Sequence, residues 1–321
     1  MISKKAKNSS KAVDVALESV SRAVITAKFH LNVPADFFEV WLLAISLNAD
    51  KPLDAFDAWG LRLVGPFEVL AADGKPGEEV SDIRWRHWHD PMEFTNCVQN
   101  TKDSRSHFGY CRDDPEQVPT WVARAESDHG FKPVAEGLLP AIAMHVAKVD
   151  KKGVKAGAER VKEAAADGAA SSNVKAALKA REKAAGRKHI ETFSGCGLVV
   201  PFDVEKDLGY RDYGLNEKEL TQLLNGINKE MEAGKPGKNR EEWDELGSCV
   251  SFANDECAFG MGLELGANAY SHGSPILRPE SLRLMGISYK LLGRTPLCDI
   301  ARSMLQRKAP GDCPAALAEG G

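Results

Sequence analysis

The fold class is decided by the stretch from Leu61 to Val122, in which four short runs have the composition of β-strands. These runs are Leu61-Arg62-Leu63-Val64, Ile83-Arg84-Trp85-Arg86, His107-Phe108-Gly109-Tyr110 and Trp121-Val122. Gly, Pro and Asp residues separate the runs, as is typical of strands that are joined by turns. The stretch therefore predicts a sheet.

Helices are predicted on both sides of this sheet. One begins near Pro34, because proline suits the first turn of a helix, and Phe37, Trp41 and Ile45 then repeat at four-residue spacing. We expect that face to lie in the core. Residues 135 to 148 are also apolar with helical character. Helices flanking a sheet in this order predict an α+β amino-terminal domain.

The chain after Ile190 contains a second set of elements. The run Gly197-Leu198-Val199-Val200-Pro201 predicts a buried strand, and Asn216 with Glu219 forms the capping box of a following helix. Val250 and Phe252 alternate with polar residues, which favours a strand that ends at Ala253. Two helices are predicted near the end, over 279–292 and over 297–304, and a second α+β domain follows from these elements.

The predicted organisation is thus two α+β domains joined by a basic helical connector. The amino-terminal domain covers residues 13–149, the connector 150–190 and the carboxy-terminal domain 191–308, with disordered tails over 1–12 and 309–321. From Lys148 to Lys188 there are twelve Lys or Arg against five Asp or Glu, a net charge of +7 within a chain of net charge −4. Such a connector can guide a partner, but a solvated helix face is the more ordinary explanation.

Composition excludes several classes of protein. The 43% hydrophobic content is normal for a globular chain, and no window approaches the roughly 18 apolar residues of a membrane span. The amino terminus lacks the apolar run of a secretory signal. Seven cysteines are scattered and never form CxxC, which argues against a disulfide framework or a structural zinc site and favours a reducing compartment.

Two nominal motifs fail on inspection. Gly260, Gly262 and Gly266 have three residues in the second interval where the dinucleotide fingerprint has two, and they follow acidic residues rather than a strand. His87 and His89, with Asp90, would share one face of a strand and form a possible metal pair. Because Trp and Arg are interleaved with them, a polar strand face is the favoured interpretation.

An acidic cluster remains as the candidate site. Asp255 and Glu256 are adjacent, Asn254 before them is a good turn former, and Glu264 adds a third carboxylate. The nearby glycines would let the backbone pass close to another element. These acids either form a site or cap turns and pair with arginines, and the sequence supports both equally. Arg211, likewise, either clamps a carboxylate or decorates a loop.

The sequence resembles the histone PARylation factor family, the accessory proteins of DNA-damage-activated poly(ADP-ribose) polymerases. The resemblance rests on Thr192-Phe193, Gly195, Gly197-Leu198-Val199-Val200-Pro201, Gly209-Tyr210-Arg211, Phe252-Ala253-Asn254-Asp255-Glu256-Cys257 and Gly260-Met261-Gly262-Leu263-Glu264-Leu265-Gly266. Weaker similarity includes Pro34-x-Asp36-Phe37 with Trp41, a helix that is also similar to the SMI1/KNR4 recognition fold. The similarity spans about residues 30 to 305.

The resemblance implies that the protein binds the catalytic domain of a poly(ADP-ribose) polymerase beside its NAD site. The composite active site would direct ADP-ribosylation to serine, on histones and on the polymerase itself. Carried over by position, Glu256 would be the general base for the acceptor serine and Asp255 would organise the polymerase surface. Tyr210 and Arg211 would belong to the docking surface, and Phe252 would pack beneath the acidic pair.

Further expectations follow from the resemblance. The polymerase holds NAD, so the chain itself needs no cofactor and no metal, and it would act as a monomer without sequence-specific nucleic acid binding or membrane attachment. In a eukaryote it would lie in the nucleus, on chromatin at DNA damage, and otherwise in the cytoplasm. The family pattern implies an acid at position 258, where this chain has Ala258. Two alternatives stay open, an autonomous ADP-ribosyl hydrolase and a non-catalytic recognition module.

Overall fold

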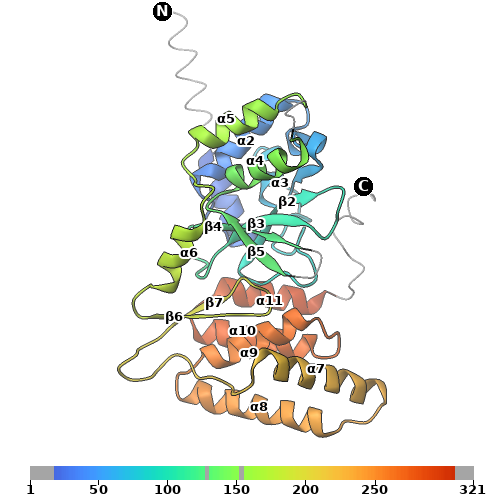
Figure 1. Cartoon of the computed structure of the whole chain (residues 1–321), viewed down its shortest axis with the longest axis vertical. Coiled ribbons are helices and arrows are strands. Elements are labelled where there is room, and N and C mark those ends of the chain that lie inside the picture. Colours follow the sequence, from blue (N-terminus) through green and yellow to red (C-terminus); the bar gives the residue numbers. More distant parts are fainter. Residues whose placement is uncertain (1–17, 127–129, 152–154, 308–321) are drawn as a thin grey trace, which may run out of the picture.

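The computed structural model describes residues 18–126, 130–151 and 155–307. Along the long axis of the molecule, an antiparallel sheet lies between two layers of helices (Figure 1). Helices from the first half of the chain lie at one end, the sheet lies in the middle, and helices from the second half lie at the other end. The predicted tails over 1–12 and 309–321 fall outside the described residues. The mixture of helices with a small antiparallel sheet confirms the α+β class.

The elements of the first half are a helix over 18–29, α2 (Ala35–Leu47), η1 (Pro52–Asp54), η2 (Asp57–Trp59), β1 (Leu61–Leu63), α3 (Pro66–Ala71), β2 (Phe94–Asn100), β3 (His107–Cys111), β4 (Trp121–Ala125), β5 (Phe131–Ala135) and α4 (Leu138–Val149). The remaining elements are α5 (Ala158–Asp167), α6 (Lys175–Glu182), β6 (Arg187–Ile190), β7 (Leu198–Pro201), α7 (Glu217–Glu232), α8 (Lys238–Asp255), α9 (Gly260–His272), α10 (Arg278–Leu291) and α11 (Thr295–Gln306).

The main sheet is a meander in the order β1-β2-β3-β4-β5, with every neighbouring pair antiparallel. Three of the four predicted runs are confirmed as β1, β3 and β4. The strand predicted over 83–86 is wrong, because this segment forms turns with Trp85 at φ 63°. The Arg86 guanidinium is buried and donates to the carbonyl oxygens of Pro91 and Phe94. The alternation of charged and apolar residues over 83–86 therefore resembled the pattern of a strand, although the segment is not one.

Helix α2 begins where predicted, but its buried face differs from the prediction. Phe37, Val40 and Ala44 are fully buried, whereas Ile45 is 39% exposed. Spacings of three and four residues hold a stripe on one side of a helix, while a strict spacing of four rotates away from it. The core face is therefore the one through Val40, and the assignment of Ile45 to the core was wrong.

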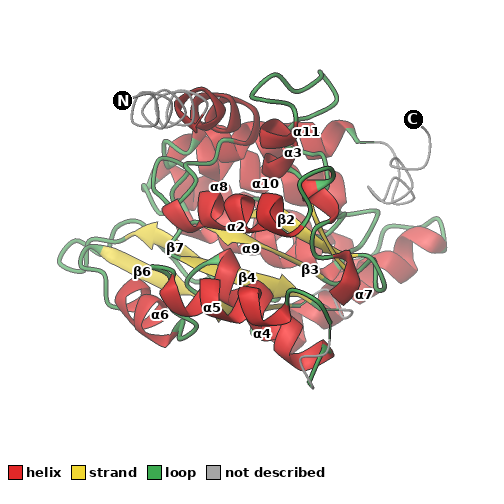
Figure 2. Ribbon diagram, turned by 90° about the horizontal axis from the view of Figure 1, so that it is seen from above, coloured by secondary structure: helices red, strands yellow, loops and turns green. Residues whose placement is uncertain are grey.

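The predicted connector region contains α5, α6 and the start of β6. Ala158 and Val161 of α5 are buried in the same hydrophobic cluster as α2 and α4, so α5 packs into the first half of the molecule. Helix α6 has no buried residue and lies beside β6 (Figure 2). The second half adds the β6-β7 ribbon and the helices α7 to α11. The division into two domains and the likeness to the SMI1/KNR4 fold stay predictions.

The strand predicted to end at Ala253 is wrong, because that segment is the last part of α8. Its buried residues are Trp243, Leu246, Val250 and Ala253, at spacings of three, four and three. That is the helical pattern, and it outweighs the short alternation of Val250 and Phe252. The strand at 198–201, the capping box of α7 and the two last helices are confirmed.

The two halves meet through buried polar contacts as well as apolar ones. Tyr289 donates to Glu93 at 2.6 Å, and Arg278 stacks 3.5 Å over the Trp88 ring while donating to the Trp88 carbonyl at 2.8 Å. Burial raises the pKa of Glu93, against the hydrogen bond from Tyr289. No helix among the residues described combines the length and the apolar character needed to cross a bilayer.

Three glycines of α9 mark close approaches to other elements, as the sequence predicted. A Cβ at Gly260 would lie 3.0 Å from the Gly209 carbonyl oxygen, and one at Gly262 would lie 2.7 Å from Val250 of α8. A Cβ at Gly266 would lie 2.9 Å from Cγ of Met285 and 3.0 Å from the Ser281 carbonyl oxygen, both on α10. Helix α9 therefore packs against α8, α10 and the loop at 209 at once.

This packing predicts opposite effects for two glycine-to-alanine changes in helices. Gly266→Ala should lower the free energy of unfolding by about 1–3 kcal/mol, because the added methyl overpacks the contact with α10. Gly247→Ala, in α8 with no atom within 4 Å of its Cβ position, should raise it by about 0.5–1 kcal/mol through helix propensity. Urea unfolding of both variants measures the two changes in the free energy of unfolding. A stabilising effect of Gly266→Ala would contradict the close approach of α9 to α10.

Candidate functional site

Glu256 lies at the carboxyl end of α8, in a helix cap with fixed geometry. Cys257 has φ 61°, in the left-handed region, and its N–H donates to the Asn254 carbonyl at 3.1 Å. The N–H of Ala258 donates to the Ala253 carbonyl at 2.7 Å, and both alanine side chains are buried. These two bonds and the apolar contact form a Schellman motif. The backbone that carries Glu256 is therefore held by hydrogen bonds on either side.

The Glu256 carboxylate forms an ion pair with Arg211. Nη2 of Arg211 lies 2.5 Å from Oε2 of Glu256, and the two side chains are 55% and 56% exposed. An exposed pair of this kind contributes at most about 1 kcal/mol, so the carboxylate can exchange its partner at little cost. The alternative in which Arg211 pairs with an acid is therefore the one observed, and the carboxylate of that acid is 56% exposed. That these acids form a functional site stays a prediction.

The neighbouring residue Tyr210 points to a different acid. Its hydroxyl donates to Oε2 of Glu264 on α9 at 2.9 Å, and the Lys188 ammonium lies 4.0 Å from the centre of its ring. Burial raises the pKa of Glu264 to about 7, while the Tyr210 hydrogen bond opposes that rise. Burial, followed by the charge of Glu264, raises the pKa of Tyr210. The loop at 210–211 therefore joins the end of α8 to the middle of α9.

Two other predicted site residues lie on the same helix end. Asp255 is the last residue of α8 and is exposed, and no ion pair is found for it within the described ranges. Phe252 is 66% exposed, so the prediction that it packs beneath the acidic pair is wrong. The stripe through Val250 and Ala253 is the one that turns inward, which leaves Phe252 on the solvent side. Ala258 is buried, so an acid at this position would not simply extend the exposed acidic surface.

A hollow of about 720 Å³ adjoins this helix end. Cys257 and Phe259 line it on one side, and Val204 and Leu208 of the loop after β7 line it on the other. Val204 is 78% exposed and Leu208 is 40% exposed, so solvent reaches the apolar side chains of this hollow. Both residues stand among acidic and basic residues without periodicity, so no sequence pattern predicted this surface.

His87 and His89 are not arranged as the predicted metal pair. Because 83–90 is not a strand, His87 and His89 share no strand face; His87 stacks on His107 with ring centres 4.0 Å apart. His107 in turn lies 3.0 Å from Asp90, with both side chains buried. No group of three or more potential ligands is arranged for a metal ion in the part of the chain that the structure describes.

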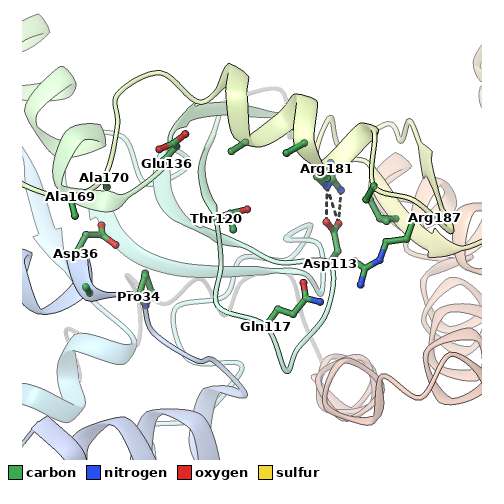
Figure 3. Close-up of a pocket in the computed structure, with 15 residues that line it drawn as sticks. Pro34, Asp36, Asp113, Gln117, Thr120, Glu136, Ala169, Ala170, Arg181 and Arg187 are labelled. Atoms are coloured by element: carbon green, nitrogen blue, oxygen red, sulfur yellow. Dashed lines mark hydrogen bonds and ion pairs between the residues drawn. The ribbon is translucent and has the colours of Figure 1, made fainter.

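A cavity of about 570 Å³ lies between α6 and the start of α2 and contains none of the predicted site residues (Figure 3). Several of its polar side chains have partners within the protein. Arg181 forms a two-pronged pair with Asp113, with distances of 2.6 to 3.0 Å. Asp36 accepts hydrogen bonds from the Tyr110 hydroxyl and the Leu138 N–H. These contacts tie the connector and α2 to the sheet, so they have a structural explanation.

Known proteins are similar to this chain over almost its whole length. A family model described as histone PARylation factor 1 matches residues 20–308. Proteins called histone PARylation factor 1 from Bos taurus and Danio rerio are each 30% identical, covering 94% and 95% of this chain and 91% of each relative. A Homo sapiens protein called putative histone PARylation factor 1-like is 29% identical over 93% of the chain and 90% of its own length. The chain therefore belongs to the histone PARylation factor 1 family.

Proposed function

We propose that this protein is an accessory factor that completes the active site of a poly(ADP-ribose) polymerase and directs ADP-ribosylation to serine. The observation that carries the proposal is the Glu256 carboxylate, which is exposed yet fixed at a Schellman cap. The names of the relatives support a role in histone PARylation. Histones and the polymerase itself are the proposed acceptors.

The chemistry needs a base at this position. A serine hydroxyl is a weak nucleophile at neutral pH, and breaking the bond between ribose and nicotinamide develops positive charge on the sugar. Glu256 would accept the serine proton as the oxygen attacks the ribose carbon, while nicotinamide leaves with the bonding electrons. Its ion pair with Arg211 is exposed and uses Oε2, so the other carboxylate oxygen would accept the serine proton while Arg211 stays beside the carboxylate.

The rest of the site would come from the partner. The polymerase would hold NAD, so this chain contributes neither cofactor nor metal to the reaction. Glu256 is more than half exposed in the free chain, whereas oxocarbenium chemistry is protected from water in an active site. Covering Glu256 with the polymerase would supply that exclusion. We propose a monomer that acts in the nucleus, on chromatin at DNA damage.

The docking surface would surround the end of α8. Phe252, Asp255 and Arg211 are exposed there, and the hollow lined by Val204 and Leu208 adjoins them. Aromatic residues and arginine are enriched in binding hot spots, and both are exposed here. The acids Asp255 and Glu256 and the apolar hollow suit a protein partner better than the phosphates of a nucleic acid.

Replacing Glu256 tests the proposed base. Glu256→Gln should lower serine transfer to a histone peptide by about 100- to 10,000-fold, since the amide cannot accept the proton. Binding to the polymerase and the unfolding transition should stay near those of the natural chain, because the lost ion pair is exposed. The measurement is initial-rate transfer with NAD, nicked DNA and the activated polymerase. Glu245→Gln, a change at an exposed acid of α8, is the control, and full transfer by Glu256→Gln would refute the assignment.

Replacing surface side chains tests the docking surface. Phe252→Ala and Arg211→Ala should each weaken binding to the polymerase catalytic domain by about ten-fold or more, because truncating a hot-spot residue costs over 1 kcal/mol. Met144→Ala, which removes a 49% exposed side chain from α4, should leave the affinity unchanged. Titration calorimetry gives the three dissociation constants. If Phe252→Ala and Arg211→Ala bound the catalytic domain as tightly as the control Met144→Ala, the interface would lie elsewhere.

A further inference from the structure

The loop that carries Arg211 is anchored to α9 at two points. The Gly209 carbonyl accepts a hydrogen bond from the Gly260 N–H at 2.9 Å, and the Tyr210 hydroxyl donates to Glu264 at 2.9 Å. Gly209 has φ 113° and so little room that a Cβ would lie 2.1 Å from the Pro201 carbonyl oxygen. The backbone is thus held at 209 and the side chain at 210. Arg211 is the next residue, and it pairs with Glu256.

We infer that Glu264 is a positioning residue for Glu256, acting through Tyr210 and Arg211. The inference rests on the proposed function and concerns the regulation of the same site. Glu264 is half-buried, and its Oε2 atom accepts the hydrogen bond from the Tyr210 hydroxyl, so we assign it a role through Tyr210 and not as a second base. Its effect on the acceptor serine would pass through the orientation of the Arg211 guanidinium, which faces the Glu256 carboxylate.

The strength of this anchor depends on the charge of Glu264. A hydrogen bond to an ionised carboxylate is roughly twice as strong as one between neutral groups, so Tyr210 is held more firmly when Glu264 is ionised. The charged or titratable groups that face Glu264 are Lys188 on β6 and Tyr210, Asp212 and Tyr213 on the loop before α7. Among them Lys188 favours ionisation and Asp212 opposes it.

Burial raises the pKa of Glu264 from 4.5 to about 7, so its charge changes near neutral pH. As pH rises through about 7, the anchor should strengthen and serine transfer should increase. The free energy of unfolding, in contrast, should fall as the pH rises. An acid with a raised pKa in the folded state binds more protons folded than unfolded between about 4.5 and 7, so stability falls across this range and stays level above it.

Because serine transfer should rise with pH while the free energy of unfolding falls, the two measurements distinguish a positioning role of Glu264 from a merely structural one. Glu264→Gln keeps a neutral acceptor for Tyr210 and so mimics the protonated state at every pH. Serine transfer by the variant should match the natural chain at about pH 6 and fall roughly ten-fold below it at about pH 8, since small misplacements of reacting groups have effects of this size. Its free energy of unfolding should equal or exceed that of the natural chain at the higher pH.

The experiment uses the full chain with NAD, nicked DNA, the activated polymerase and a histone peptide, at saturating accessory protein. The variants are Glu264→Gln, Tyr210→Phe, the double variant and the surface control Glu232→Gln, and each rate is divided by that of the natural chain at the same pH. We expect the double variant to be no slower than the slower single variant, because both changes act on the same hydrogen bond: Glu264→Gln weakens it and Tyr210→Phe removes it. The control should give a ratio near one throughout.

A ratio for Glu264→Gln that does not change with pH, or fully additive effects in the double variant, would overturn the inference. The proposed function fails separately, if Glu256→Gln retains full serine transfer. If Glu256→Gln abolishes transfer while Glu264→Gln behaves like the natural chain at every pH, the base stands and only the positioning role is lost.

Discussion

The candidate site depends on how closely α9 approaches its neighbours. The glycines at 260, 262 and 266 let its backbone approach the loop at 209, α8 and α10 more closely than any larger residue would allow. Each glycine within a helix costs about 0.5–1 kcal/mol of stability relative to alanine, because of its backbone entropy. The close packing offsets this cost. It also positions two segments against α9, namely the end of α8 with Glu256 and the loop with Tyr210 and Arg211.

The site therefore has a buried frame and an exposed working surface. The frame consists of α9, the Schellman cap at the end of α8 and the hydrogen bond from Tyr210 to Glu264. The working surface consists of Glu256, Arg211, Asp255 and Phe252, all of which are exposed. A hydrogen-bonded backbone beneath exposed side chains suits the proposed contact with a second protein, because the backbone position is fixed while the exposed groups can exchange partners.

Much of this arrangement could be predicted from local patterns, and the rest could not for identifiable reasons. The capping box of Asn216 and Glu219 was readable because a short spacing specifies both hydrogen bonds. The end of α8 was misread because Val250 and Phe252 alternate over too few residues to distinguish a strand from a helix. Strand β2 was missed because its buried face includes Thr95, Asn96 and Gln99. The bond between Tyr210 and Glu264 joins residues 54 apart, which no spacing rule reaches.

The exposure of Glu256 favours the proposed accessory role over an autonomous one. An enzyme that hydrolyses ADP-ribosyl bonds alone would need a pocket that excludes water and holds phosphate near its acids. Here Glu256 is more than half exposed, next to Cys257 in the lining of an apolar hollow, and Oε2 of Glu264 accepts the hydrogen bond from Tyr210. Under the proposed function, the polymerase would hold NAD and would shelter Glu256 from water. A carboxylate on a fixed backbone without cover of its own fits that proposal better than a site that works alone.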